Sequence, residues 1–218
     1  MPPTPQLLAR GPWAPDEVLF TWSEEPFEAA SAATEAADAA IDALRARDSP
    51  SHDGVATRLV AHRTDEAGRL HLTLQPVRWA LRLLPEGAAR SMTGQCVVRD
   101  QEGRWLAGRR ASWVATWAGR WTLGAGGAVD PGESPMRTLE RELQEEWSVA
   151  PARLRGDLLL LLPNDMVMFV GVAWLPAGAE VTPDHEHDAY EWWPASIDAW
   201  PDHADEGLRR MAREVEAR

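Results

Sequence analysis

The stretch GAVDPGESPMRTLERELQEEWSV, residues 127–149, carries the most informative pattern in the sequence. Ser134 is a favourable N-cap, and Pro135 suits the first position of a helix. Apolar residues then recur at the spacing of one helical face, at Met136, Leu139, Leu143 and Trp147. We therefore expect a helix that begins after Ser134, continues to about Trp147 and packs on the core through this apolar stripe.

The same helix is unusually acidic, because ERELQEEW at its end places four glutamates within seven residues. Like charges one helical turn apart destabilise a helix by a few tenths of a kcal/mol per pair. Glu142, Glu145 and Glu146 share a face that differs from the apolar stripe. Clustered carboxylates suit Mg²⁺ or Mn²⁺, whereas a solvent-exposed acidic face is the alternative.

The spacing around this helix resembles a known family signature. Gly127 is followed after five residues by Glu133, and seven residues later by RELQEEWSV, residues 141–149. This pattern is similar to the Nudix box, with Ser148 in place of the final glycine. The resemblance extends from about Met92 to the end of the chain and leaves residues 1–90 outside it.

The resemblance implies roles for the matching residues. Glu142, Glu145 and Glu146 are expected to bind the metal and act in catalysis, and the backbone carbonyl near Gly127 is expected to complete the metal ligands, since glycine allows close approach of the backbone. Glu186 is a further candidate ligand, because family members often carry a glutamate shortly before a Glu-Trp strand. The general base remains open between Glu142 and Glu186.

Two further positions of the box are expected to act on its structure. Arg141, which we count among the catalytic residues, is expected to pair with Glu133 and to hold the loop against the helix. The family glycine would end the helix in a left-handed conformation, which costs a residue such as Ser148 about 1 kcal/mol. We read Ser148 as a variant turn that leaves the carboxylates intact.

Four residues that precede the box in the sequence are candidates for substrate binding. Arg109 and Arg110 end an expected strand, where the family often places an arginine that contacts phosphate, and Arg120 precedes the glycine-rich loop. Trp121 is a candidate for stacking on a base or a sugar. The alternatives are surface positions for the arginines and core packing for the tryptophan.

Composition excludes several classes of protein. The net charge of −12 and pI near 4.9 argue against general nucleic-acid binding, and the basic residues are all arginine, so a phosphate-binding group here must be arginine or metal. The single cysteine, Cys96, excludes an internal disulfide. The sequence shows no signal peptide and no apolar run long enough for a membrane span, so we expect a cytoplasmic protein without membrane contact.

The overall pattern predicts an α+β protein of two parts. Residues 1–90 are expected to form an N-terminal α+β domain or extension, with an extended lead-in to about residue 17, a helix over residues 26–47, a hairpin over residues 55–77 and a short helix near residues 77–84. Residues 91–218 are expected to adopt the Nudix fold, a mixed sheet between helices.

The resemblance implies a Mg²⁺-dependent hydrolase, with Mn²⁺ as a second possible cofactor, that cleaves the diphosphate of a nucleoside diphosphate linked to another group. A nucleotide sugar such as UDP-glucose or ADP-ribose is slightly favoured. The alternatives are a non-catalytic nucleotide-sensing module and a Nudix-fold isomerase of isopentenyl diphosphate. A homodimer is common in the family and is a further expectation.

Overall fold

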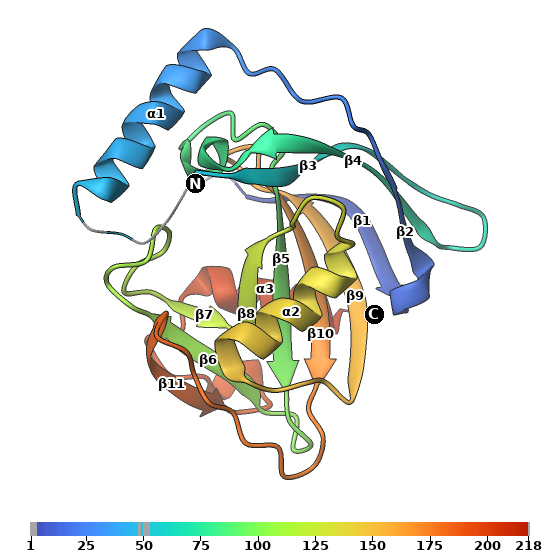
Figure 1. The fold of residues 1–218 in the computed structure, drawn as a ribbon. Helices are drawn as coiled ribbons and strands as arrows, with labels where there is room; N and C mark the ends of the chain where they lie inside the picture. The colour runs from blue at the N-terminus through green and yellow to red at the C-terminus, as the bar shows by residue number, and fades with distance from the viewer. Residues whose placement is uncertain (1–3, 48, 50–52, 218) are drawn as a thin grey trace.

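Strands β9, β10 and β5 form the middle of the main sheet in the computed structural model, which describes residues 4–47, 49 and 53–217 (Figure 1). The order across the sheet is β1-β9-β10-β5-β6-β11, with β7 beside β6 and β8 beside β5. Strand β10 runs parallel to β5 and antiparallel to β9, so the sheet is mixed. Its strands are β1 Gln6–Trp13, β5 Met92–Arg99, β6 Trp105–Arg110, β7 Trp121–Leu123, β8 Ala125–Ala128, β9 Arg153–Leu161, β10 Val167–Trp174 and β11 His187–Trp193.

Helices α2 (Pro135–Trp147) and α3 (Glu206–Glu216) cover opposite faces of this sheet (Figure 1). The side chains of β10 alternate between the two faces, as strand geometry requires. Phe169 packs in one hydrophobic cluster with the stripe of α2, and Val170 packs in another with the apolar face of α3. The expected α+β architecture, a mixed sheet between helices, is confirmed.

The N-terminal part forms a second, smaller sheet in the order β2-β4-β3. Strands β3 (Val55–Thr64) and β4 (Leu70–Arg78) pair antiparallel, which agrees with the predicted hairpin, and β2 (Val18–Trp22) lies parallel to β4. Helix α1 (Ser31–Arg45) packs on this region together with the 3₁₀ helix η2 (Trp79–Leu83). The remaining 3₁₀ turns are η1 Pro15–Glu17 and η3 Ile197–Ala199.

Three N-terminal predictions were wrong in detail. The expected lead-in contains strand β1, which pairs antiparallel with β9. The helix begins at Ser31 instead of Pro26, because the backbone N–H of Phe27 donates to the carbonyl of Pro76 and keeps the preceding segment beside β4. The short helix near residues 77–84 begins only after Arg78 and is a 3₁₀ helix. Most of the predicted loop at 48–54, namely 48 and 50–52, lies outside the described residues.

The two parts of the chain share a hydrophobic core. Leu59 and Leu72 of the small sheet belong to the same buried cluster as Leu139 and Trp147 of α2. Strand β1 also joins the N-terminal segment to the main sheet. The division at residue 90 remains a prediction.

Within the part of the chain that the structure describes, no helix is both long enough and apolar enough to cross a membrane.

Helix α2 ends at Ser148 in the left-handed conformation, with φ 54° and ψ 33°. The backbone N–H of Ser148 donates to the carbonyl of Gln144 and closes the last turn. This is the geometry expected where the family pattern has glycine, because a side chain destabilises the left-handed region by about 1 kcal/mol.

The conformation of Ser148 gives a first prediction. Ser148→Gly should raise the free energy of unfolding by about 0.5 kcal/mol, because relief of backbone strain exceeds the added flexibility of the unfolded chain. Chemical denaturation would measure this change. Ser196→Gly is the matched control, because Ser196 has φ −77° and gains nothing from glycine. A loss of stability in Ser148→Gly as large as in the control would contradict the strain argument.

Candidate active site

Helix α2 is positioned by its N-cap and its apolar stripe. The hydroxyl of Ser134 accepts a hydrogen bond from the backbone N–H of Arg137 at 3.2 Å, and Pro135 occupies the first turn. The stripe is fully buried, as predicted, at Met136, Leu139, Leu143 and Trp147. This packing fixes the rotation of the helix and turns Glu142 and Glu146 toward strand β8.

Glu142 and Glu146 are the two buried carboxylates of α2, with 8% and 4% of their surface exposed. Glu146 accepts a hydrogen bond from the backbone N–H of Gly126 at 3.1 Å. At Gly127 a Cβ atom would lie 2.1 Å from Oε1 of Glu142, so only glycine leaves room for this carboxylate. The box glycine on β8 therefore makes space for Glu142, a catalytic candidate on α2.

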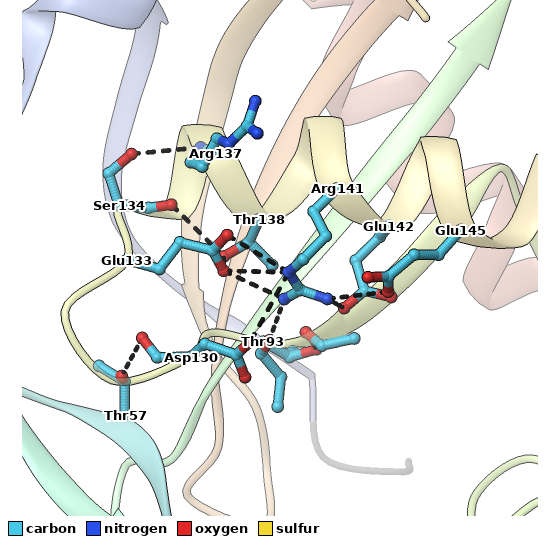
Figure 2. A network of polar contacts seen from close by, with 12 residues as sticks. Thr57, Thr93, Asp130, Glu133, Ser134, Arg137, Thr138, Arg141, Glu142 and Glu145 are labelled. Atoms are coloured by element: carbon cyan, nitrogen blue, oxygen red, sulfur yellow. Dashed lines mark hydrogen bonds and ion pairs between the residues drawn. The ribbon is translucent and has the colours of Figure 1, made fainter. Parts of the chain in front are cut away.

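Arg141 lies at the centre of a network that joins the loop to the helix (Figure 2). Its guanidinium bonds Glu133 at 3.1 Å, Glu142 at 2.7 Å and Glu145 at 3.1 Å, and it also donates to the carbonyl of Ala128. Glu133 in turn accepts a hydrogen bond from Thr138 at 2.8 Å. The expected pairing of Arg141 with Glu133 is present.

Glu145 differs from the other two glutamates of the predicted metal set. Its side chain is 57% exposed, and its carboxylate is turned to Arg141 beside Glu142 (Figure 2). The structure therefore brings Glu142 and Glu146 into the interior and leaves Glu145 at the rim. A ligand role for Glu145 remains a prediction.

The carboxylates of Glu142 and Glu146 repel each other, and both are largely shielded from water. Burial, only partly offset by Arg141, raises the pKa of Glu142 to about 7. Burial and the neighbouring charge of Glu142 raise the pKa of Glu146 well above its ordinary value. A carboxylate pair of this kind is costly to keep ionised unless a cation joins it.

This repulsion gives a second prediction, for the metal-free protein. Between pH 4.5 and the raised pKa, the folded state holds more protons than the unfolded chain, so the free energy of unfolding falls as pH rises. Glu146→Gln removes this loss and keeps the acceptor for Gly126. We expect it to stabilise the chain in EDTA at pH 8 by about 1 kcal/mol, since one pKa unit corresponds to roughly 1.4 kcal/mol.

Urea unfolding in EDTA at pH 5 and pH 8 would measure this difference. Glu140→Gln is the matched control, because Glu140 lies on the same helix in an exposed pair with Arg137. The free energy of unfolding of Glu140→Gln should equal that of the wild-type chain at both pH values. A variant Glu146→Gln that is clearly less stable at pH 8 would count against the repulsion.

Strands β6 and β11 place a third acidic candidate beside this pair. Arg110 at the end of β6 forms an ion pair with Glu186 at 2.8 Å. Glu186 lies close enough to Glu146 to raise its pKa further, after burial and Glu142. Arg110 opposes that effect, so it lies near the carboxylates, and its contact with phosphate remains a prediction.

His187, which follows Glu186, is a buried member of the site that the sequence did not single out. Its Nε2 lies 3.7 Å from a carboxylate oxygen of Glu146 and has no hydrogen-bond partner among the described residues. Gly108 on β6 leaves space for the ring, since a Cβ there would lie 2.4 Å from it. Burial, with the charge of Arg110, lowers the pKa of His187 and favours the neutral ring.

The other three candidates for substrate binding lie further out. Arg109 is exposed and pairs with Asp188 at 2.6 Å, and Arg120 is exposed and pairs with Asp205 at 2.7 Å. Trp121 is half-buried and stacks on the ring of His203 at 4.7 Å. Arg120 and Trp121 line the cavity described next, whereas Arg109 does not.

A cavity of about 1420 Å³ lies beside these groups. Glu146, Gly126 and Arg110 form part of its wall, so it reaches one of the two buried carboxylates. Its apolar wall comes from the sheet face opposite α2 and from α3, at Leu158, Leu160, Met168, Leu208 and Met211. A cavity of this kind is the default site for a small ligand.

The donor set fits a hard divalent cation. Among the described residues no three His, Cys, Asp or Glu side chains already converge as ligands. Mg²⁺, however, is commonly bound by one or two carboxylates together with water and substrate phosphates. Glu142 and Glu146 supply two buried oxygen ligands whose mutual repulsion a cation would relieve. Gly127 packs closely against Glu142, and its carbonyl accepts a hydrogen bond from Thr93, so a ligand role for that carbonyl remains a prediction.

The family model of the NUDIX domain matches residues 92–214 of this chain. This match covers more than half of the sequence, so the chain belongs to the Nudix family. The family and fold predicted from the box are therefore confirmed.

Similar solved structures include the MutT protein of Methanosarcina mazei Go1, with 26% identity over 57% of this chain and 94% of that chain and a TM-score of 0.44. The NUDIX domain of Shewanella oneidensis NrtR, complexed with ADP ribose, has 22% identity over 57% of this chain and 87% of that one, with a TM-score of 0.43. The C. elegans Ap4A hydrolase has 19% identity over 58% of this chain and 96% of that chain, with a TM-score of 0.45.

A curated relative is the isopentenyl-diphosphate Delta-isomerase of Corynebacterium diphtheriae, which is 37% identical over 69 residues. The match covers 32% of this chain and 37% of the isomerase, so this chain spans little more than a third of that relative's length.

Proposed function

We propose that the chain is a hydrolase of the Nudix class that cleaves the diphosphate linkage of a nucleoside diphosphate joined to another group. The observation that carries this proposal is the buried pair Glu142 and Glu146, of which Glu146 lines a large cavity together with Arg110. The family match supports the same class of reaction.

The proposed cofactor is Mg²⁺, with Mn²⁺ as the alternative, held by Glu142 and Glu146 with Glu145 and Glu186 as further candidates. When bound, the cation supplies positive charge against the phosphates and makes water more acidic. Repulsion between an anionic substrate and the bare carboxylates is the reason a cation is needed.

The side chains of the site can divide the remaining work. Glu142, with its pKa near 7, or Glu186, which is more exposed, would accept the proton of the attacking water. Arg110 would orient a phosphate, and its ion pair with Glu186 would hold both groups in place. Arg141 and Glu133 would act by keeping Glu142 and the glycine loop in register.

A nucleotide sugar, such as UDP-glucose or ADP-ribose, is the finer proposal for the substrate. The cavity supports a ligand with more than a phosphate group, because it offers Trp121 and Arg120 as well as an apolar wall. The isomerase alternative has one specific observation in its favour, the match to the Corynebacterium diphtheriae enzyme. A homodimer and a cytoplasmic location remain predictions.

A substrate panel tests the proposal. The purified chain would be incubated with Mg²⁺ and nucleoside diphosphate sugars, ADP-ribose, dinucleoside polyphosphates, nucleoside triphosphates and isopentenyl diphosphate. Release of a nucleoside monophosphate or another phosphate product identifies the hydrolase and its substrate. Isomerised isopentenyl diphosphate would favour the isomerase, and binding without any product would favour a nucleotide-sensing module.

A further inference from the structure

Arg82 is a cavity-lining arginine that lies outside the family match. It belongs to η2 in the N-terminal part of the chain, whereas the match begins at residue 92. It nevertheless lines the same cavity as Glu146, Gly126 and Arg110. The N-terminal part therefore contributes a positive charge to the wall of the proposed active site.

The position of Arg82 is fixed by the packing of its neighbours. Ala80 and Leu81 are buried in the cluster that α1 forms with η2. The backbone N–H of Trp79 donates to the carbonyl of Gly54, and that of Ala80 donates to Asp53 at 3.2 Å. These contacts anchor η2 and hold Arg82 toward the cavity.

Arg82 has no carboxylate partner among the described residues. Its side chain is partly buried, and its one hydrogen bond is a long contact of 3.5 Å to the hydroxyl of Thr93. Burial lowers the pKa of Arg82 to about 10; Glu142 opposes this shift and Arg110 adds to it. The ring of Trp79, 5.6 Å from the guanidinium carbon, is a cation–π partner but supplies no negative charge, so an anion would add the charge that this buried guanidinium lacks.

The hydroxyl of Thr93 links Arg82 to the box. Thr93 donates a hydrogen bond to the carbonyl of Gly127 at 2.7 Å while its oxygen faces Arg82. Arg82 is thus two hydrogen bonds from the glycine that makes room for Glu142. An anion bound by Arg82 would lie beside the carboxylate site and not at a remote part of the cavity.

The charge of the cavity wall is opposite to that of the chain. The chain carries −12 overall. Within the described residues, three acidic side chains line the cavity, Glu146, Asp205 and Glu214. Six arginines line it, Arg10, Arg47, Arg82, Arg110, Arg120 and Arg210. A local excess of arginine in an acidic protein favours an anionic ligand.

We propose that Arg82, together with Arg110, binds a phosphate group of the substrate, so that the N-terminal part of the chain completes the anion-binding site. This inference rests on the proposed function for the identity of the substrate. It adds a binding residue from outside the Nudix domain. Guanidinium groups suit this role because their planar donors match phosphate oxygens in pairs.

Binding of inorganic pyrophosphate tests the proposal without turnover. Calorimetric titration of the full chain in buffer with Mg²⁺ should show binding by the wild-type chain and a roughly ten- to hundredfold weaker Kd for Arg82→Gln. Arg82→Lys should recover part of the affinity, because it restores charge but not the paired donors. Arg63→Gln is the charge-matched control, since Arg63 is exposed on β3 and outside the cavity.

Three results would overturn the role of Arg82: no binding by the wild-type chain, unchanged affinity in Arg82→Gln, or an equal loss in Arg63→Gln. Thermal unfolding of each variant shows that it is folded. If the substrate panel yields no product while Arg82→Gln still weakens binding, the hydrolase proposal fails and the anion site stands. If substrate is cleaved and Arg82→Gln keeps the wild-type KM and affinity, the hydrolase proposal stands and the role of Arg82 fails.

Discussion

Replacing Glu142 or Glu146 by glutamine should lower kcat by roughly a hundred- to ten-thousandfold, the range typical of groups that act directly on proton transfer. Both carboxylates are buried and Glu146 lines the cavity, and each variant retains nearly the same shape while losing a negative charge. The measurement is the rate of product release from the substrate found in the panel, at saturating Mg²⁺. Magnesium affinity, measured by calorimetry, should fall in parallel.

Two variants on the same helix sharpen this test. Glu140→Gln removes an exposed charge paired with Arg137 and should leave kcat within about twofold of the wild-type value. Glu145→Gln is expected from the box to abolish turnover, although its carboxylate lies at the rim against Arg141. Full activity in both Glu142→Gln and Glu146→Gln would remove the basis of the proposed mechanism.

Replacing Arg141 by methionine should destabilise the chain by about 3 kcal/mol, because it leaves two largely buried carboxylates without their partner. The side chains of Glu133 and Glu142 are 14% and 11% exposed, and both bond this guanidinium. For a chain of this size the midpoint of thermal unfolding should fall by roughly 6 to 12 °C. Calorimetric unfolding in EDTA measures the shift without a contribution from metal.

The control is Arg137→Met, in which an exposed arginine of the same helix loses its pair with Glu140. It should change the free energy of unfolding by less than about 0.5 kcal/mol. A double-mutant cycle of Arg141→Met with Glu133→Gln should show a coupling energy of roughly 1 to 3 kcal/mol. Additive effects would mean that the pair does not hold the loop to the helix.

The box segment was predictable in detail because its signals are local. The N-cap at Ser134, the buried stripe of α2 and the left-handed end at Ser148 follow from residues within one or two helical turns. The pair of Arg141 with Glu133 was implied by the resemblance to the Nudix box.

The burial of individual site residues could not be predicted in this way. Glu142, Glu145 and Glu146 looked equivalent on one face, yet only two of them lie in the interior. The sequence did not single out His187, although its place on β11 opposite Arg110 buries it against Glu146. Burial does not alternate regularly along residues 187–193, and the pairing with β6 is irregular between His187 and Ala189, so no local pattern marked this residue.

The helix of the box, its carboxylates and the family could be predicted from local patterns, because capping, periodicity and motif spacing involve residues close together in the chain. The pairing of β1 with β9, and the position of Arg82 at the same cavity as Glu146, emerge only in the folded protein. Those contacts join segments far apart in the chain, and their free energy comes from shared burial and charge. No local pattern of residues records such contacts.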